Sequence, residues 1–249
     1  MKTILIIGAT SSIAQACVQQ WCILEKELAF ILVARDQQKL QDFSQNLVIR
    51  YPHICIHQRY MDLRQFEQVH IALNEEFKQS QIDIALIAQG LMYVDESSLE
   101  VDQSVDLVGI NSVSVAVCLD VIYKNMIRQN IGKIGVISSV AGDRGRKANY
   151  LYGASKSFIS TYVEGLQHRI ALLGQNIHVS LIKPGPTASL MTQHLVEEGK
   201  KLANVDDVAK IIVEGVEHKK RIIYSPKIWF FIMFIIKKIP FFLFKKLDI

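Results

Sequence analysis

Short apolar runs alternate with longer stretches of mixed polarity along most of this chain, a pattern that predicts strands followed by helices. The pattern predicts strands at residues 3–7, 29–34, 53–59, 82–88, 134–139, 177–183 and 221–224, of which 53–59 mixes polar and apolar residues. The stretches between them predict helices at residues 11–24, 37–50, 63–79, 103–129, 149–173 and 206–218. Asn204 stands just before the last of these helices and is a suitable N-cap.

Repeated strand–helix–strand units of this length predict an α/β fold, a doubly wound parallel sheet with helices on both faces. Ligands of such sheets bind beyond the carboxyl ends of the strands. The residues at the predicted carboxyl ends are Gly8, Arg35, Asp62, Gly90, Ser139 and Pro184. Because these ends share one edge of a parallel sheet, we expect the functional site there.

Length and composition fit one globular domain. The chain has 249 residues, which we divide into a domain at 1–225 and a tail at 226–249. Half of the residues are hydrophobic and 21% are charged, as in ordinary globular proteins. None of the four cysteines has C-x-x-C spacing, so we expect no metal site and no disulfide framework, and reduced thiols fit a cytoplasmic protein. The apolar run at the start is too short for a signal peptide.

Tyr152 and Lys156 are the strongest candidates for chemistry. They lie four residues apart on a predicted helix, so their side chains share one face. The usual pKa of a phenol is about 10, and a nearby cation is expected to lower it toward the working range. Ser139, at the end of a predicted strand, is placed to hydrogen-bond a carbonyl group. A Tyr and a Lys at this spacing are also common on ordinary helices, as one packed ring and one solvated charge.

The turn after the first predicted strand suits a cofactor. It has the sequence Gly8-Ala9-Thr10-Ser11-Ser12-Ile13-Ala14 and opens a helix. The backbone N–H groups of such a turn bind a pyrophosphate. The candidate cofactor-binding residues are Gly8, Thr10, Ser11, Ser12 and Ile13. An ordinary strand–helix turn is the alternative.

Arg35 follows the second predicted strand and favours NADPH over NADH, because an arginine there accommodates a 2′-phosphate. Asp36 then caps the following helix. An ordinary surface cation is the alternative for Arg35. Asp62, after the third predicted strand, is placed to meet the adenine, to cap a helix, or both.

Combined with Asp62-Leu63, Gly90, Asn111 and Pro184-Gly185, these motifs resemble the short-chain dehydrogenase/reductase family over residues 2–224. The resemblance implies a Rossmann fold, an NAD(P) cofactor and a ketone-reducing site. Tyr152 would be the proton donor and Ser139 would orient the carbonyl. Lys156 would lower the pKa of Tyr152 and hold the nicotinamide ribose.

Other residues gain roles from the same resemblance. Asn111 would hold a water in a proton relay, although from the residues alone it is equally a satisfied buried amide in an apolar helix. Thr187 would bond the nicotinamide amide or cap the next helix. The remaining implied cofactor contacts are Leu63, Gly90, Pro184 and Gly185.

Two loops depart from the family's pattern. Ser12 and Ala14 stand where glycines are usual, and Ile87-Ala88-Gln89-Gly90 replaces Asn-Asn-Ala-Gly. The pattern is similar to a branch that reduces keto-sugars on polyprenyl-phosphate carriers, including the decaprenyl-phospho-ketopentose 2-reductases. Members of that branch also carry apolar, basic C-terminal tails.

The tail differs in composition from the rest of the chain. Its apolar run at 228–236 is much shorter than the roughly 20 residues that a spanning helix needs. Lysines flank this run, an arrangement that suits a helix lying in a membrane interface, and Pro240 should end that helix. A contact between subunits or a flap over the substrate site are the alternatives. The lysines are interleaved with bulky apolar residues and the net charge is only +4, so we do not expect nucleic acid as a partner.

The sequence thus predicts an NADPH-dependent ketone reductase, cytoplasmic and peripheral at the inner face of a membrane. Its most specific candidate substrate is a keto-sugar on a polyprenyl-phosphate carrier. The alternatives are a reductase of a 3-oxoacyl, steroid or retinoid-type carbonyl, or a cofactor-binding sensor or scaffold without turnover. The resemblance implies that residues 188–203 cover the substrate, with Leu190, Met191 and Leu195 on the inner face to contact it or simply to pack the lid. The family usually pairs subunits through the helices at 103–129 and 149–173, which predicts a homodimer or homotetramer.

Overall fold

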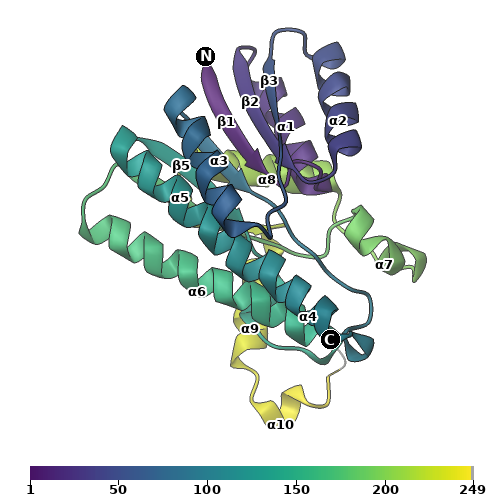
Figure 1. The fold of residues 1–249 in the computed structure, drawn as a ribbon. Coiled ribbons are helices and arrows are strands. Elements are labelled where there is room, and N and C mark those ends of the chain that lie inside the picture. Colours follow the sequence, from purple (N-terminus) through teal and green to yellow (C-terminus); the bar gives the residue numbers. More distant parts are fainter. Residues whose placement is uncertain (248–249) are drawn as a thin grey trace.

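Seven parallel strands form one sheet at the centre of the molecule, in the order β3-β2-β1-β4-β5-β6-β7 (Figure 1). The computed structural model describes residues 1–247, so the last two residues of the predicted tail lie outside it. The strands are β1 Lys2–Ile7, β2 Leu28–Ala34, β3 Cys55–Tyr60, β4 Ile84–Ile87, β5 Gly132–Ile137, β6 Ile177–Pro184 and β7 Ile222–Ser225. The chain winds outward from β1 in both directions, which confirms the predicted doubly wound fold.

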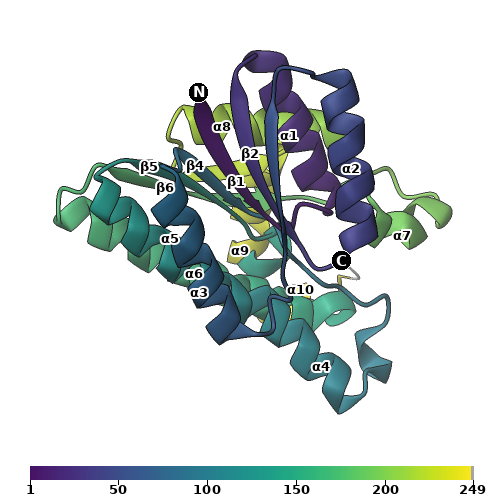
Figure 2. The same ribbon diagram turned by 45° about the horizontal axis from the view of Figure 1, so that its top comes forward.

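Helices cover both faces of the sheet (Figure 2). One layer holds α1 Ser12–Leu24, α2 Gln37–Arg50 and α8 Val205–Glu217. The other holds α3 Phe66–Gln79, α4 Val101–Val108, α5 Ser114–Gln129 and α6 Tyr150–Leu172. Each layer buries its own apolar cluster, with Trp21 and Leu40 in the first and Leu119 and Ile159 in the second. Burial of these residues against the sheet is the main source of stability.

Local hydrogen bonds explain where the helices begin. Asp36 accepts from the Lys39 backbone N–H and Asn204 accepts from that of Asp206, so both predicted N-caps are confirmed. Helix α3 begins at Phe66, three residues later than predicted, because the segment before it forms a turn stabilised by the Asp62 side chain. The Asp62 carboxylate accepts from the Arg64 backbone N–H.

The predicted helix at 103–129 is not uniform. A π-helical turn, η2 Gly109–Val113, joins α4 to α5. Such turns are frequent at functional sites, and this one carries Asn111. By length and composition the stretch Val101–Gln129 could cross a membrane, but half of its apolar window is buried inside the fold. We therefore assign it to the core.

The tail forms two helices that pack on the domain. They are α9 Ile228–Lys238 and α10 Phe241–Phe244, and Pro240 separates them as predicted. Trp229 lies against Gly185, Met233 is fully buried, and the Arg144 guanidinium donates to the Ile236 carbonyl oxygen. The domain side of α9 is therefore part of the folded body.

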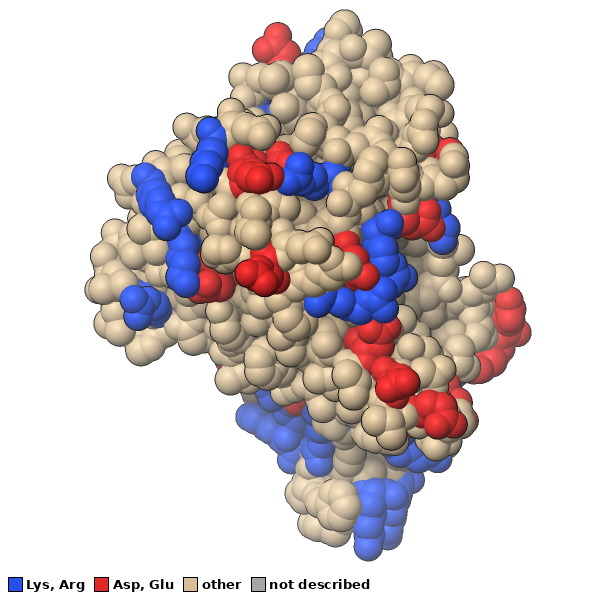
Figure 3. All heavy atoms as spheres, in the orientation of Figure 1, with Lys and Arg blue, Asp and Glu red and all other residues tan. Residues whose placement is uncertain are grey.

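The opposite side of the tail is apolar and exposed. Its exposed large side chains are Ile228, Phe230, Phe231, Phe234, Ile235, Phe241, Phe242, Leu243 and Leu247. Lys and Arg gather around them at the lower end of the molecule in Figure 3. We call this set of exposed side chains the outer face.

Candidate functional site

Ser139, Tyr152 and Lys156 come together at the carboxyl end of β5. Ser139 caps a short turn, η3 Val140–Asp143, by accepting from the Ala141 backbone N–H at 3.1 Å. Its hydroxyl also hydrogen-bonds the Tyr152 phenol. The Lys156 ammonium donates to the Ile137 carbonyl oxygen at 3.3 Å and lies 5.7 Å from the centre of the Tyr152 ring. The fold therefore brings these three predicted side chains to one point.

Two glycines allow the η3 turn to press against α6. A Cβ on Gly142 would lie 2.7 Å from the Lys156 carbonyl carbon, and a Cβ on Gly153 would lie 2.9 Å from the Ala141 carbonyl oxygen. Ser138 adds a direct bond, because its hydroxyl donates to the Lys156 carbonyl oxygen at 2.8 Å. This backbone contact holds Ser139 beside the helix that carries Tyr152.

The pKa shifts of Tyr152 and Lys156 differ from those expected from the sequence. Burial raises the pKa of the Tyr152 phenol, and the hydrogen bond with Ser139 opposes that rise only in part. The expected lowering by Lys156 is therefore not what the structure gives. Burial also lowers the pKa of Lys156 to about 8, because a cation loses its hydration there. Near neutral pH the phenol keeps its proton and the ammonium form predominates.

Asn111 organises the loop that follows β4. Its amide oxygen accepts from the Leu91 backbone N–H at 2.8 Å and its amide nitrogen donates to the Leu91 carbonyl oxygen at 2.7 Å. The side chain is a satisfied buried amide, one of the two interpretations of the sequence. A Cβ on Gly90 would lie 3.5 Å from both the Asn111 amide oxygen and the Lys156 ammonium nitrogen. Gly90 thus leaves open space between these two groups.

The turn after β1 combines a glycine of positive φ with a helix N-terminus that has no side-chain cap bond. Gly8 has φ of +79°, and a Cβ there would lie 2.6 Å from the Gln89 backbone nitrogen. No other residue type fits this position without strain. Ser11 caps α1 without a side-chain hydrogen bond, which leaves the first N–H groups of the helix for a ligand. These features fit the phosphates of a dinucleotide even though Ser12 and Ala14 replace glycines.

Arg35 and Asp62 lie at the neighbouring ends of β2 and β3. Arg35 is exposed and close enough to Asp62 to lower the pKa of that carboxyl, although the larger cause is the hydrogen bond from Arg64. Arg64 holds Asp62 in a two-pronged ion pair at 2.8–3.1 Å. Asp62 is therefore not the N-cap of α3, a place that Gln65 takes. Leu63, the last of this group of candidates, is buried beside it.

Gln89 stands at the alanine position of the family's Asn-Asn-Ala-Gly, next to the two lost asparagines. Its amide nitrogen donates to the Ser114 hydroxyl at 3.3 Å. Its amide oxygen is buried and has no hydrogen-bond partner.

Pro184 ends β6, and Gly185 follows beneath Trp229 of α9. The Thr187 hydroxyl donates to the Gly185 carbonyl oxygen at 2.9 Å, while Ser189 caps the next turn, η5 Leu190–Thr192. The alternative that Thr187 caps a helix is therefore wrong.

The predicted lid contains η5 and α7 Gln193–Glu197. The Met191 methyl lies 3.8 Å from the position of a Cβ on Gly90, so this side chain faces the site as expected. Leu190 is 77% exposed, so it does not form the inner face expected of it. Leu195 is partly buried.

A buried ionic cluster below the Ser139 turn escaped the sequence analysis. The Lys183 ammonium bonds the Asp143 carboxylate at 2.6 Å, and the Tyr224 hydroxyl donates to the same carboxylate at 2.7 Å. Burial is the larger cause that raises the pKa of Tyr224, and Asp143 adds to it. The one sequence feature that could have indicated this cluster was Lys183, a lysine at the end of an apolar strand. Among residues 1–247 no group of three or more His, Cys, Asp or Glu could hold a metal ion.

Comparison with known proteins places these observations in context. The family model described as short chain dehydrogenase matches residues 2–200. An uncharacterized oxidoreductase of Staphylococcus saprophyticus is 24% identical over 213 residues, which cover 84% of this chain and 83% of the relative. One from Staphylococcus aureus is 23% identical over 226 residues, covering 89% and 93%.

Solved structures agree in fold. A short-chain dehydrogenase from Sphingobium yanoikuyae in complex with NADPH matches with a TM-score of 0.81 at 19% identity, covering 97% of each chain. One from Burkholderia phymatum in complex with NAD matches with a TM-score of 0.80 at 20% identity, covering 93% of this chain and 91% of that one. At these identities the match concerns the fold alone, and the neighbours include complexes with either cofactor.

Proposed function

Because the chain belongs to the short-chain dehydrogenase family, we propose that this NAD(P)-dependent oxidoreductase reduces a ketone to an alcohol with Tyr152 as proton donor. The observation that carries the proposal is the convergence of Ser139, Tyr152 and Lys156 at one end of β5. A sensor or scaffold without turnover has no need of such a proton donor.

Each residue of the site has a defined task in this reaction. When bound, the cofactor would supply a hydride to the carbonyl carbon. Ser139 donates a hydrogen bond to the carbonyl oxygen and orients it. Tyr152 gives its proton to that oxygen as negative charge develops, and the Lys156 ammonium stabilises the phenolate that remains. Burial keeps the phenol protonated until this moment, which favours the reducing direction.

NADPH is the proposed cofactor. Arg35 is exposed at the end of β2, where a 2′-phosphate would lie, and supplies the charge that binds it. Arg64 neutralises Asp62, so that carboxylate adds little repulsion toward the phosphate. Ser12 and Ile13, at the N-terminus of α1, would face the pyrophosphate, and Lys156 the nicotinamide ribose.

The proposed substrate is a lipid-linked ketone, in its most specific form a keto-sugar on a polyprenyl-phosphate carrier. Arg146 supports an anionic group on the substrate, because its Nε is buried without a partner in the loop between Ser139 and Tyr152. Met191 supports an apolar group on it. Another lipid-like carbonyl, of the 3-oxoacyl, steroid or retinoid type, is the second candidate, favoured by Met191 alone.

We further propose that the protein is cytoplasmic and binds the inner face of a membrane through the outer face of α9 and α10. Aromatic side chains between lysines suit the boundary between headgroups and acyl chains. Since α9 also packs on Gly185 and Arg144, the domain and the tail would act as one body. The site would then open close to the bilayer that holds its substrate.

The experiment that tests the function compares wild type with Tyr152→Phe. NADPH and then NADH are titrated against the quenching of Trp and Tyr fluorescence, and NADPH consumption is followed with a polyprenyl-phosphate keto-sugar, a 3-oxoacyl thioester and a steroid ketone. We expect tight binding of NADPH by both proteins and loss of about 10²–10⁴-fold in kcat in the variant. Unchanged turnover in Tyr152→Phe, or no binding of either cofactor, would refute the proposal.

A further inference from the structure

Glu96 is a buried carboxylate outside the residues assigned so far. It lies in the loop between β4 and α4, in the short turn η1 Glu96–Ser98, and is only 5% exposed. Asp95 builds this turn by accepting from both the backbone N–H and the hydroxyl of Ser97, at 2.9 and 2.6 Å. The turn therefore holds Glu96 in a fixed direction.

The carboxylate of Glu96 points at the first turn of α6. One oxygen accepts from the Leu151 backbone N–H at 2.7 Å, and the other accepts from that of Tyr152 at 2.9 Å. The Tyr150 hydroxyl donates to the Glu96 carbonyl oxygen at 3.2 Å. Three successive residues of the helix thus bind one residue of a distant loop.

This contact replaces the local cap that α6 lacks. Asn149, which precedes the helix, makes no side-chain hydrogen bond to it. The first N–H groups of a helix need acceptors, and a negative charge is favourable at that end. A carboxylate satisfies two of them at once because each oxygen accepts separately.

We propose that Glu96 is a positioning residue for catalysis, whose carboxylate clamps the backbone of Tyr152 and thereby fixes the phenol relative to Ser139. One of the clamped N–H groups belongs to Tyr152 itself. The same loop is tied at its other end, where Asn111 binds Leu91 on both sides. The loop between β4 and α4 is therefore bonded both to Asn111 and to the backbone of Tyr152. The inference rests on the proposed function, because it gives Glu96 a task in that same site.

The test compares Glu96→Gln, Glu96→Asp and the control Glu100→Gln. A glutamine keeps one acceptor and turns an NH₂ group toward a backbone N–H, so half of the clamp is lost. We expect kcat of Glu96→Gln with NADPH and a ketone to fall about 10²-fold, since small misplacements of a reacting group have that effect. The Kd for NADPH should stay within a factor of about two, and Glu96→Asp should recover part of the rate.

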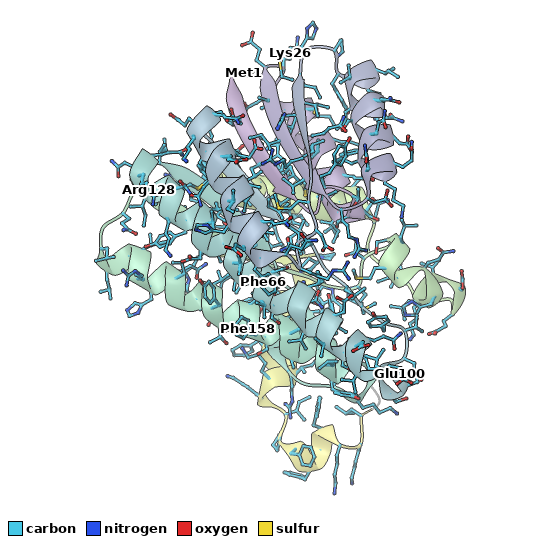
Figure 4. All side chains as sticks on the ribbon, viewed as in Figure 1. Met1, Lys26, Phe66, Glu100, Arg128 and Phe158 are labelled. Carbon is cyan, nitrogen blue, oxygen red and sulfur yellow. The ribbon has the colours of Figure 1, made fainter. Side chains whose placement is uncertain are left out.

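Glu100 is a matched control from the same loop. Its side chain takes part in the capping box of α4, and Figure 4 shows it at the start of that helix. Glu100→Gln should therefore lower Tm without changing kcat. If Glu100→Gln lowers kcat as much as Glu96→Gln does, the loss of any helix cap in this loop is enough to slow the reaction. The positioning role of Glu96 is then refuted.

Two readouts separate positioning from simple stability. In a Tyr152→Phe background, Glu96→Gln should lower the residual kcat no further, because Glu96 acts through the phenol. Amide exchange at Leu151 and Tyr152 should rise about tenfold in Glu96→Gln with the rest of α6 unchanged.

Failure of the inference differs from failure of the proposed function. Unchanged kcat or unchanged exchange in Glu96→Gln would overturn the clamp. If wild type reduces no ketone, the proposed function fails, whereas the exchange rates still decide whether Glu96 holds the backbone of Tyr152.

Discussion

At the residue scale, burial shifts the two titrating partners of the site in opposite directions. It raises the pKa of Tyr152 and lowers the pKa of Lys156 to about 8, because each neutral form is favoured away from water. A protonated phenol beside an ammonium suits a proton donor for an alkoxide. The site is therefore in its reducing state when the pH is below the pKa of Lys156.

This assignment predicts an alkaline limb in the pH profile. Reduction should slow as pH rises through about 8, because Lys156 then loses the charge that stabilises the phenolate. The measurement is kcat/KM for NADPH across pH 6 to 10, since this ratio reports the free enzyme. The residual activity of Lys156→Arg should show no such alkaline decrease, because a guanidinium stays protonated. A limb that persists in this variant would assign it to another group.

Stability gives a check on Lys156 that needs no activity. The usual pKa of a lysine is about 10.4, so between pH 8 and that value the unfolded chain holds a proton that the folded protein has released. The free energy of unfolding should therefore rise with pH over this window. Urea unfolding should show that rise in wild type and less of it in Lys156→Met.

The sequence predicted the residues whose partners lie on the same helix or at a strand end. Tyr152 and Lys156 follow from helical spacing, and Ser139 from its place after an apolar run. Glu96 binds a helix 55 residues away, and Lys183 pairs with Asp143 across two strand ends. Such contacts depend on how loops close in space, which periodicity along the chain does not encode.

At the element scale, the pattern of apolar and polar residues predicted the seven strands and most of the helices of residues 1–247. Boundaries moved where polar side chains formed turns, as Asp62 does before α3. The π-helical turn η2 could not be predicted from the sequence. An apolar helix shows the same spacing of apolar residues with or without such a turn. For α9 the composition predicted an exposed apolar helix, yet its other side packs on the domain through Met233.

The two sides of α9 call for point variants rather than removal of the tail. The double variant Phe231→Glu/Phe234→Glu changes only the outer face, where these rings are 61% and 54% exposed. We expect its binding to vesicles of phosphatidylglycerol and phosphatidylcholine to fall at least about tenfold, because a charge in the interface opposes burial. Sedimentation with the vesicles measures this, and reduction of a water-soluble ketone should continue.

Ile49→Glu is the matched control for this experiment. Ile49 is 81% exposed on α2, away from the tail. It adds one negative charge, half of the change in the double variant, and should leave vesicle binding unaltered. If the double variant still sediments as wild type does, the outer face does not bind the membrane.

At the scale of the whole molecule, a second apolar surface lies between α3, α5 and α6. It is a groove of about 510 Å³ whose lining includes Phe66, Val113, Val117 and Phe158. Figure 4 places Phe66 and Phe158 on the same side of the molecule. The proposed homodimer or homotetramer would use this surface, since an exposed apolar groove gains stability when a second copy covers it.

We expect Phe158→Glu to shift a dimer to monomer, because Phe158 is 51% exposed at this groove and a buried charge there would lack a partner. Ile23→Glu, on the far end of α1, carries the same change and should leave the mass unaltered. Analytical ultracentrifugation in detergent solution measures both masses. Equal masses for Phe158→Glu and wild type would exclude this groove as the subunit contact.

Helix α9 packs on the domain with one side only, and this determines how the mass of the oligomer must be measured. In plain buffer the rings of Phe231 and Phe234 stay in water, so copies of the protein would associate through their tails whatever the groove does. A detergent micelle covers the tail as a bilayer would and leaves α5 and α6 free to pair. Purification without detergent would therefore select aggregates, and only the micelle-bound protein would report the true stoichiometry of the enzyme.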